Sequence, residues 1–185
     1  MFDTAPDLTK MVKTAIRVMV NDFHAERAVV VFAEQPTSQP PSLGIYGFEG
    51  DIWREPTIYR PLLEQVLHKN KTVLCSDLRE RPQIRFNPTH RAAACVPLRS
   101  ITGEPLGFFY CDHTRPGALD RHFGQLKEMA AAFDKRRIQL LAETSKGQRK
   151  PRRISLWALI VGSLALLCLV GAGFTFWYLQ TNSGG

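Results

Sequence analysis

The chain has 185 residues, 24 of them Lys or Arg and 17 Asp or Glu, so its formal net charge is +7. Apolar residues make up 44% and charged residues 22%, a composition typical of a folded domain, which excludes a wholly disordered chain. Five basic residues lie together between positions 146 and 153, and the remaining chain carries 19 basic against 17 acidic residues. Because the excess charge is local, we expect no nucleic-acid partner.

The first half of the chain alternates between helical and strand-like patterns. Apolar residues recur at helical spacing from Leu8 to Phe23, which predicts an amphipathic helix, and Thr4 with Asp7 three residues later is a suitable cap. The β-branched run at residues 28–33 predicts a buried strand. A loop with three prolines follows at residues 34–42, and residues 43–48 form the predicted partner strand.

The second half continues this alternation. A helix is predicted from Tyr59 to Leu67, and Asn70 can end it. A brief strand at residues 72–75 precedes a long polar connection, and residues 92–98 and 106–111 form two strands joined by a hairpin turn containing Gly103. A long helix at residues 119–141 closes the domain. The order predicts an α+β fold, an antiparallel sheet flanked by helices.

The closing helix carries a nearly heptad apolar series, interrupted by Arg137. Its members are Leu119, Phe123, Leu126, Ala130, Phe133 and Leu140. This spacing allows two arrangements, a helix that lies on its own sheet or one that pairs in part with a second protomer. A homodimer through the terminal helices is therefore one predicted partner arrangement.

Residues 154–179 contain no Asp, Glu, Lys, Arg or His. A helix needs about 20 apolar residues to cross a bilayer, so this segment predicts one C-terminal transmembrane helix. Trp157 at one end and Trp177 and Tyr178 at the other are the residue types that favour the two membrane interfaces. The predicted domains are a soluble domain at 1–144, a basic linker at 145–153, the span at 154–179 and a short tail at 180–185.

The basic linker predicts the orientation of this span. Its cations are Lys146, Arg149, Lys150, Arg152 and Arg153. Because Lys and Arg resist translocation, we expect a single-pass protein with a cytoplasmic N-terminal domain and the short C-terminus on the opposite side, in a bacterial inner membrane. The same cations are suited to anionic lipid headgroups.

Two strand sequences suggest a family. Residues 94–98 read ACVPL and residues 105–112 read PLGFFYCD, with a turn at Gly103 between them. This resembles the C-terminal half of a GAF domain, in which a VPL strand, a hairpin and a second strand ending in Asp precede a closing helix. The order of the earlier elements also matches, so the resemblance covers residues 7–141. It implies a GAF-like sensory or regulatory module, a type that binds small ligands or dimerises.

The binding signatures of GAF subfamilies are incomplete here. Asn70, Lys71 and Phe86 match the start of the Asn-Lys…Phe…Asp-Glu signature of cyclic-nucleotide-binding members, but Asn-Pro-Thr-His follows Phe86. The Cys-His dipeptide of bilin-binding members is absent, since Asp112 separates Cys111 from the next histidine. The cysteines also lack the motif surroundings of the free-methionine-sulfoxide reductases.

The resemblance nevertheless implies a ligand cavity bordered by the long polar connection. The candidate ligand-binding residues are Tyr46, Asp77, Arg79, Phe86, His90 and Cys111. Cations in this connection could hold an anionic ligand, and the alternative is a solvated, charged loop.

The remaining candidate chemistry is sparse. Cys75, Cys95 and Cys111 fall in predicted strands and Cys168 in the predicted span, where thiols behave as small apolar groups. Neither metal-ligand spacing nor a nucleophile or phosphate-loop motif occurs, so we expect no metal, no cofactor and no enzymatic activity. A redox sensor that uses the soluble cysteines is a weaker alternative.

The sequence thus favours a membrane-anchored, non-catalytic GAF-like accessory or scaffold subunit that docks on a larger membrane protein complex from the cytoplasmic side. The alternative is a small-ligand-binding sensory or regulatory GAF protein that signals through a separate partner.

Overall fold

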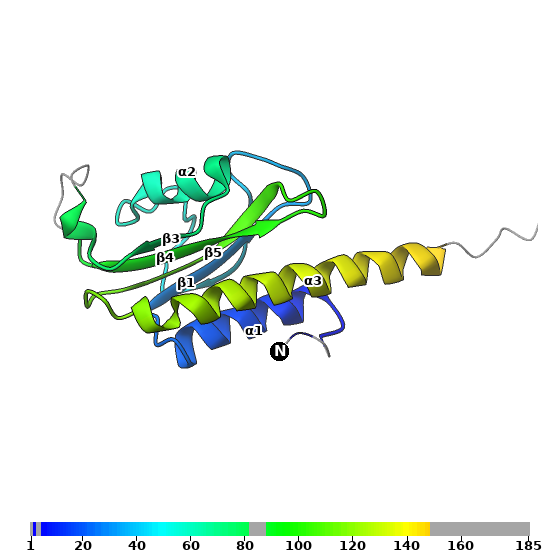
Figure 1. The fold of residues 1–185 in the computed structure, drawn as a ribbon, viewed down its shortest axis with the longest axis horizontal. Coiled ribbons are helices and arrows are strands. Elements are labelled where there is room, and N and C mark those ends of the chain that lie inside the picture. The colour runs from blue at the N-terminus through cyan, green and yellow to red at the C-terminus, as the bar shows by residue number, and fades with distance from the viewer. Residues whose placement is uncertain (1, 3–4, 82–87, 149–185) are drawn as a thin grey trace, which may run out of the picture. The chain divides into compact units, whose positions relative to one another are not determined.

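A computed structural model describes residues 2, 5–81 and 88–148. Their strands form one antiparallel five-stranded sheet in the order β2-β1-β5-β4-β3 (Figure 1). The strands are β1 (Arg27–Phe32), β2 (Ser42–Tyr46), β3 (Val73–Cys75), β4 (Ala92–Arg99) and β5 (Pro105–His113). The central strand β5 lies between β1 and β4, so its side chains are buried along nearly its whole length.

Helices cover both faces of this sheet. They are α1 (Leu8–Asn21), α2 (Arg60–Lys69) and α3 (Phe123–Gln148), with two 3₁₀ turns, η1 (Leu78–Glu80) and η2 (Asp120–His122). Figure 1 shows α2 on one face and α1 with α3 on the other. We refer to these as the α2 face and the α1/α3 face. The α+β class and the antiparallel sheet that the sequence predicted are confirmed.

Helix α1 begins at a residue whose side chain accepts a hydrogen bond from an amide in the first turn. Asp7 is the N-cap, and its carboxylate accepts a hydrogen bond from the Lys10 amide at 2.8 Å. The cap is therefore one turn later than the predicted Thr4. The apolar stripe is buried on the sheet as its spacing predicted, through Met11, Val12, Ala15, Val18 and Met19.

Helix α2 ends at Asn70, as the sequence predicted. This residue adopts a left-handed conformation with φ of 50°, which asparagine tolerates better than most residues. Its side chain also donates to the Gly103 carbonyl at 2.9 Å and accepts from Arg99 Nε at 2.8 Å. Asn70 thus joins the end of α2 to the β4–β5 hairpin, a structural role for the residue that began the cyclic-nucleotide signature.

The apolar series of α3 packs on the sheet of its own domain. Leu126, Ala130 and Phe133 are buried in the same core as β5, where the Phe133 ring meets the Phe109 ring edge-on at 5.2 Å. Arg137, which interrupts the series, lies 4.9 Å over the Phe32 ring and donates to the Arg99 carbonyl at 2.6 Å. This is the first of the two arrangements that the spacing allowed, and it leaves these buried side chains unavailable to a second protomer.

Most of the predicted membrane-related residues lie outside the described part of the chain. Lys146 falls within α3, whereas the other linker cations, Trp157, Trp177, Tyr178 and the whole predicted span at 154–179 lie outside the described residues. Within residues 2, 5–81 and 88–148, none of the helices combines the length and apolar character that crossing a membrane requires. The first compact unit of the chain ends at Thr144.

Candidate functional site

The α2 face of the sheet is the side on which chemistry-bearing residues gather. Strand alternation directs Phe108, Tyr110 and Asp112 of β5 to this face, and Val29 of β1 lies opposite Tyr110 in the ladder. Arg27 is opposite Asp112 at the end of the same two strands. The face is therefore apolar along most of its length and charged at one end.

Side chains fill the apolar part of this face. Helix α2 and the segment before it contribute buried residues, namely Ile52, Ile58, Leu62, Leu63, Val66 and Leu67. Trp53 meets the Phe108 ring edge-on at 5.9 Å and donates its indole N–H to the Pro40 carbonyl at 3.0 Å. Phe108 and Tyr110 beneath them are at most 1% exposed. The described side chains between α2 and the sheet thus pack against one another in one buried cluster.

A buried ion pair stands at the charged end. Arg27 Nε lies 2.9 and 3.1 Å from the two carboxylate oxygens of Asp112, and a second guanidinium nitrogen also donates to Asp112. The Tyr110 hydroxyl donates to the same carboxylate at 2.7 Å, and the third guanidinium nitrogen donates to Thr57 Oγ1 at 2.6 Å. The Arg27 guanidinium also lies 4.4 Å over the Phe48 ring. Both charges are therefore compensated within the chain.

Burial and charge shift the ionisation of this pair's neighbours. Burial, reinforced by the adjacent Asp112 charge, raises the pKa of Tyr110 well above its usual value, so the phenol stays protonated. Burial alone would lower the pKa of Arg27, but hydrogen bonds and attraction to Asp112 outweigh it and raise that pKa. Arg27 therefore stays charged and Tyr110 stays a neutral donor at physiological pH.

Glu26 and His90 surround the ion pair. His90 Nε2 lies 3.6 Å from a Glu26 oxygen and 3.9 Å from an Asp112 oxygen, beyond direct hydrogen bonds. Glu26 is held elsewhere, because Thr114 donates to it through Oγ1 at 2.7 Å and through its amide at 3.2 Å. Burial by itself would raise the pKa of Glu26. The hydrogen bonds from Thr114 lower it by more, so the net shift of the pKa is downward. Among the described residues, His90 Nδ1 is buried with no hydrogen-bond partner.

This arrangement is suited to structure more than to catalysis. Asp112 already accepts from Arg27 and Tyr110, so it is not a free base. His90 does not lie within hydrogen-bond distance of either neighbouring carboxylate. In the part of the chain that the structure describes, no group of three His, Cys, Asp or Glu side chains could hold a metal ion.

The structure places two of the predicted ligand-binding residues, Tyr46 and Cys111, apart from each other. Tyr46 is 48% exposed on the edge strand β2, whereas Cys111 is buried on the α1/α3 face, because alternation along β5 turns it away from Tyr110 and Asp112. Asp77 caps η1, accepting from the Arg79 amide at 3.0 Å, and pairs with Arg91.

Two predicted residues complete that set. His90 lies beside the buried ion pair, and Phe86 lies outside the described residues. The sequence reasoning missed Arg27, Tyr110 and Asp112 as a unit. The sequence feature that could have revealed this unit is a charged residue, Arg27, at the start of the apolar strand β1 together with a second, Asp112, near the end of the apolar strand β5.

The three cysteines of the domain are free, and each is at most 3% exposed. Cys95 lies on the α2 face and Cys111 on the α1/α3 face, so the sheet separates their side chains. Burial raises the pKa of both thiols, which disfavours the reactive thiolate. Cys75 accepts a hydrogen bond from Arg81 Nε at 3.2 Å. These contacts support the prediction of structural thiols.

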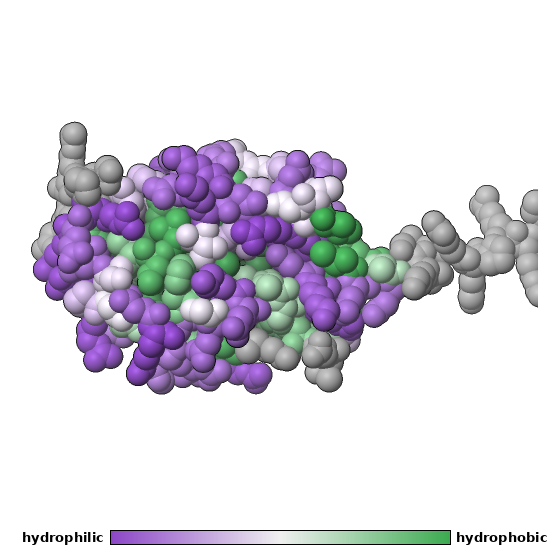
Figure 2. All heavy atoms as spheres, in the orientation of Figure 1, coloured by the Kyte–Doolittle hydropathy of each residue, from purple (hydrophilic) through white to green (hydrophobic). Residues whose placement is uncertain are grey.

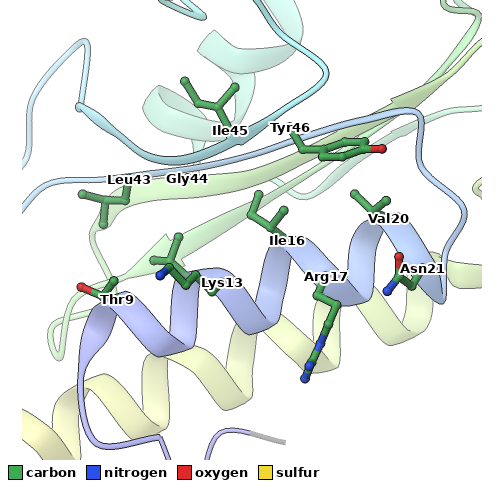
Figure 3. Close-up of a pocket in the computed structure, with 11 residues that line it drawn as sticks. Thr9, Lys13, Ile16, Arg17, Val20, Asn21, Leu43, Gly44, Ile45 and Tyr46 are labelled. Carbon is green, nitrogen blue, oxygen red and sulfur yellow. The ribbon is translucent and has the colours of Figure 1, made fainter.

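A groove lies between α1 and the edge strand β2, away from the α2 face. Figure 3 shows Ile16 and Val20 pointing from α1 toward the strand that carries Leu43 and Tyr46. The groove has a volume of about 370 Å³. Its floor is shallow at Gly44, where an added Cβ would lie 2.5 Å from Val12 Cγ1, so glycine allows the strand to approach the helix closely.

The order of the five strands, the two layers of helices and the β4–β5 hairpin define a class of small α+β domain. The family model described as GAF domain matches residues 5–134, and the chain belongs to this family. The resemblance that the two strand sequences suggested is thereby confirmed. Comparison with curated proteins found no match.

Solved structures with the same fold include enzymes and sensors. A type II free methionine-R-sulfoxide reductase from Thermoplasma acidophilum is 18% identical with a TM-score of 0.54, and the match covers 70% of this chain and 94% of that chain. Free methionine-R-sulfoxide reductase from Neisseria meningitidis, solved with its substrate, is 19% identical with a TM-score of 0.57. That match covers 72% of this chain and 79% of that chain.

A domain of a putative two-component sensor histidine kinase protein from Sinorhizobium meliloti is 13% identical with a TM-score of 0.56, covering 77% of this chain and 98% of that chain. At these identities the likeness defines the fold and leaves the function to be argued from the site.

Proposed function

We propose that this protein is a non-catalytic GAF module that works through protein contacts, as an accessory or scaffold subunit tethered to a membrane. One observation carries the proposal. The face of the sheet beneath α2 is filled by buried side chains, and its charged pair, Arg27 and Asp112, is compensated within the chain. A module whose interior is occupied in this way offers its outer surface for function.

The tether rests on the sequence. Residues 154–179 are uncharged and long enough to span a bilayer, and five cations precede them. In this proposal the GAF domain faces the cytoplasm of a bacterial cell and the cations contact anionic lipid headgroups. The partner is a larger membrane protein complex.

The absence of catalysis is proposed from the described side chains. Cys95 and Cys111 are buried on opposite faces of the sheet, and burial raises the pKa of both thiols. Asp112 is occupied by two donors, and His90 is out of hydrogen-bond reach of it. Two of the similar structures are free methionine-R-sulfoxide reductases, but we do not extend their reductase activity to this chain.

The test is purification of the full chain from its native membranes in a mild detergent, followed by native mass spectrometry. We expect one or more membrane proteins at fixed stoichiometry with the chain and no retained small molecule. Recovery of the chain alone would contradict the proposal. The Glu64→Gln variant, which changes an exposed side chain of α2, is the control for non-specific loss of partners.

A small-ligand-binding sensory role is the second candidate, and one atom favours it. His90 Nδ1 is buried without a hydrogen-bond partner among the described residues, so it could meet a polar group of a ligand. The other nitrogen of this ring, Nε2, lies 3.9 Å from Asp112. The same mass spectrum distinguishes the two functions. A small molecule released on denaturation, and lost in His90→Phe, would support sensing and contradict the scaffold.

A further inference from the structure

The groove between α1 and β2 combines an apolar lining with an open strand edge. Ile16 and Val20 are half-buried, and Leu43 and Tyr46 are 42% and 48% exposed. Ile45 lies opposite Val29 in the ladder, and its side chain points away from α1 (Figure 3). Side chains this apolar are seldom left together on the surface of a monomer unless they contact a partner. In Figure 2 hydrophilic residues cover most of the described surface in view, with smaller apolar patches between them.

The backbone of β2 is the second part of the argument. This strand is at the end of the sheet and pairs with β1 on one side, so its other edge carries N–H and C=O groups that face away from the ladder. An extended segment satisfies such groups by adding as a further strand, and its side chains then enter adjacent pockets. The bulge opposite Val30 and Val31 directs Leu43 to the groove, together with Tyr46.

The third part is charge. Lys13 and Arg17 are exposed residues of α1 among the eleven that line the groove, and these eleven include no Asp or Glu. A partner segment with carboxylates is therefore electrostatically complementary. A second copy of this chain is not, because symmetric pairing of two β2 strands would bring Lys13 and Arg17 of both copies to the same seam.

We propose that the groove and the free edge of β2 bind an extended, acidic segment of a partner protein, with its apolar side chains between α1 and β2 and its carboxylates beside Lys13 and Arg17. This inference rests on the proposed function and identifies its contact surface. Leu43 also lines a second hollow with Leu140 and Leu141, so the apolar surface continues past the end of β2.

The experiment uses the full chain in detergent micelles as bait for a random decapeptide phage library. Selected peptides are synthesised with a fluorophore and titrated by anisotropy against the unmodified chain and against the double variant Lys13→Glu/Arg17→Glu. The matched control is Lys69→Glu/Lys135→Glu, which changes the net charge equally at exposed positions outside the groove. Hydrogen exchange with and without peptide then reports on the amides of residues 42–46.

We expect enriched peptides that alternate apolar and acidic residues, a loss of affinity of about tenfold or more in the groove variant, and unchanged affinity in the control. Bound peptide should slow exchange at residues 42–46. Peptides that lack acidic residues, that bind both variants equally, or that leave this exchange unchanged would overturn the inference. So would a failure to select any peptide, or a dimer that Lys13→Glu/Arg17→Glu strengthens.

Failure of this inference and failure of the proposed function are distinguishable. If the chain still co-purifies with a membrane complex when Lys13 and Arg17 are both replaced by Glu, and no peptide binds the groove, then the scaffold role holds and another surface carries it. If no complex is recovered with the unmodified chain, the proposed function itself fails.

Discussion

At the scale of single residues, the buried pair of Arg27 and Asp112 is the feature most sensitive to substitution. Asp112 is fully buried and Arg27 is 7% exposed, so water does not compensate either charge. A buried pair of this kind adds little stability compared with apolar residues of the same shape, but removing one partner leaves an uncompensated charge. The position therefore constrains which residues the two strands can carry.

We expect Asp112→Asn to lower the free energy of unfolding by about 3 kcal/mol, because it strands the Arg27 charge in the interior. Tyr110→Phe removes one hydroxyl donor to the carboxylate and should cost about 1 kcal/mol. Urea denaturation of the variants measures both. The double variant Arg27→Met/Asp112→Leu should be less destabilised than the sum of its single changes. Strictly additive effects would contradict the coupling.

The ionisation of Asp134 makes the free energy of unfolding depend on pH. Burial raises its pKa to about 6, against the Arg99 amide that donates to it at 2.8 Å and the nearby Arg137 charge. Since the folded state binds this proton more tightly than the unfolded chain, Asp134 favours folding at low pH, and that contribution is lost as pH rises from about 4 to about 6.

The expected size of this loss is about 1–3 kcal/mol, since each pKa unit corresponds to about 1.4 kcal/mol and partial exposure reduces the effect. Asp134→Asn should flatten this part of the stability profile, measured by urea denaturation at several values between pH 4 and pH 7. Glu26 and Glu55 have lowered pKa values and act in the opposite direction, but they are present in both proteins. Parallel profiles for the two proteins would rule out the assignment.

At the scale of elements, glycines determine how closely the layers approach. An added Cβ at Gly107 would lie 1.9 Å from the Val31 carbonyl oxygen of the neighbouring strand, a contact that requires the backbone to move. At Gly44 the nearest atom is 2.5 Å away and belongs to the Val12 side chain of α1. The first position constrains β5 against β1, and the second constrains β2 against α1.

Gly107→Ala should therefore destabilise the domain more than Gly44→Ala, with costs at the upper and lower parts of a range of about 1–3 kcal/mol for overpacking. Gly124→Ala is the matched control, because an added Cβ in α3 meets nothing within 4 Å and alanine favours a helix. Thermal unfolding followed by circular dichroism compares the three. The order of the effects would be wrong if Gly107→Ala melted with the unmodified domain.

At the scale of the whole molecule, the proposed tether separates two kinds of behaviour. The chain should remain in the membrane fraction after an alkaline carbonate wash, because burial of about 20 apolar residues in the bilayer outweighs any effect of surface charge. A version that lacks residues 154–185 should appear in the wash supernatant and retain the circular dichroism spectrum of the folded domain. Release of the full chain by carbonate would contradict the tether.

Periodicity and turn chemistry were enough to predict the elements of the domain. The apolar stripe of α1, the end of α2 at Asn70 and the β4–β5 hairpin at Gly103 are local features, so neighbouring residues decide them. The GAF family followed from the two strand sequences for the same reason, since their residues pack within one hairpin.

The site required contacts between residues far apart in the chain. Arg27 and Asp112 are separated by 85 positions, and only the pairing of β1 with β5 brings them together. Two of the predicted ligand-binding residues lie apart, because strand alternation sends Cys111 to the α1/α3 face and the edge position of β2 leaves Tyr46 at the surface. Local sequence patterns indicate which side chains are apolar enough to be buried, whereas long-range strand pairing determines which of them come into contact.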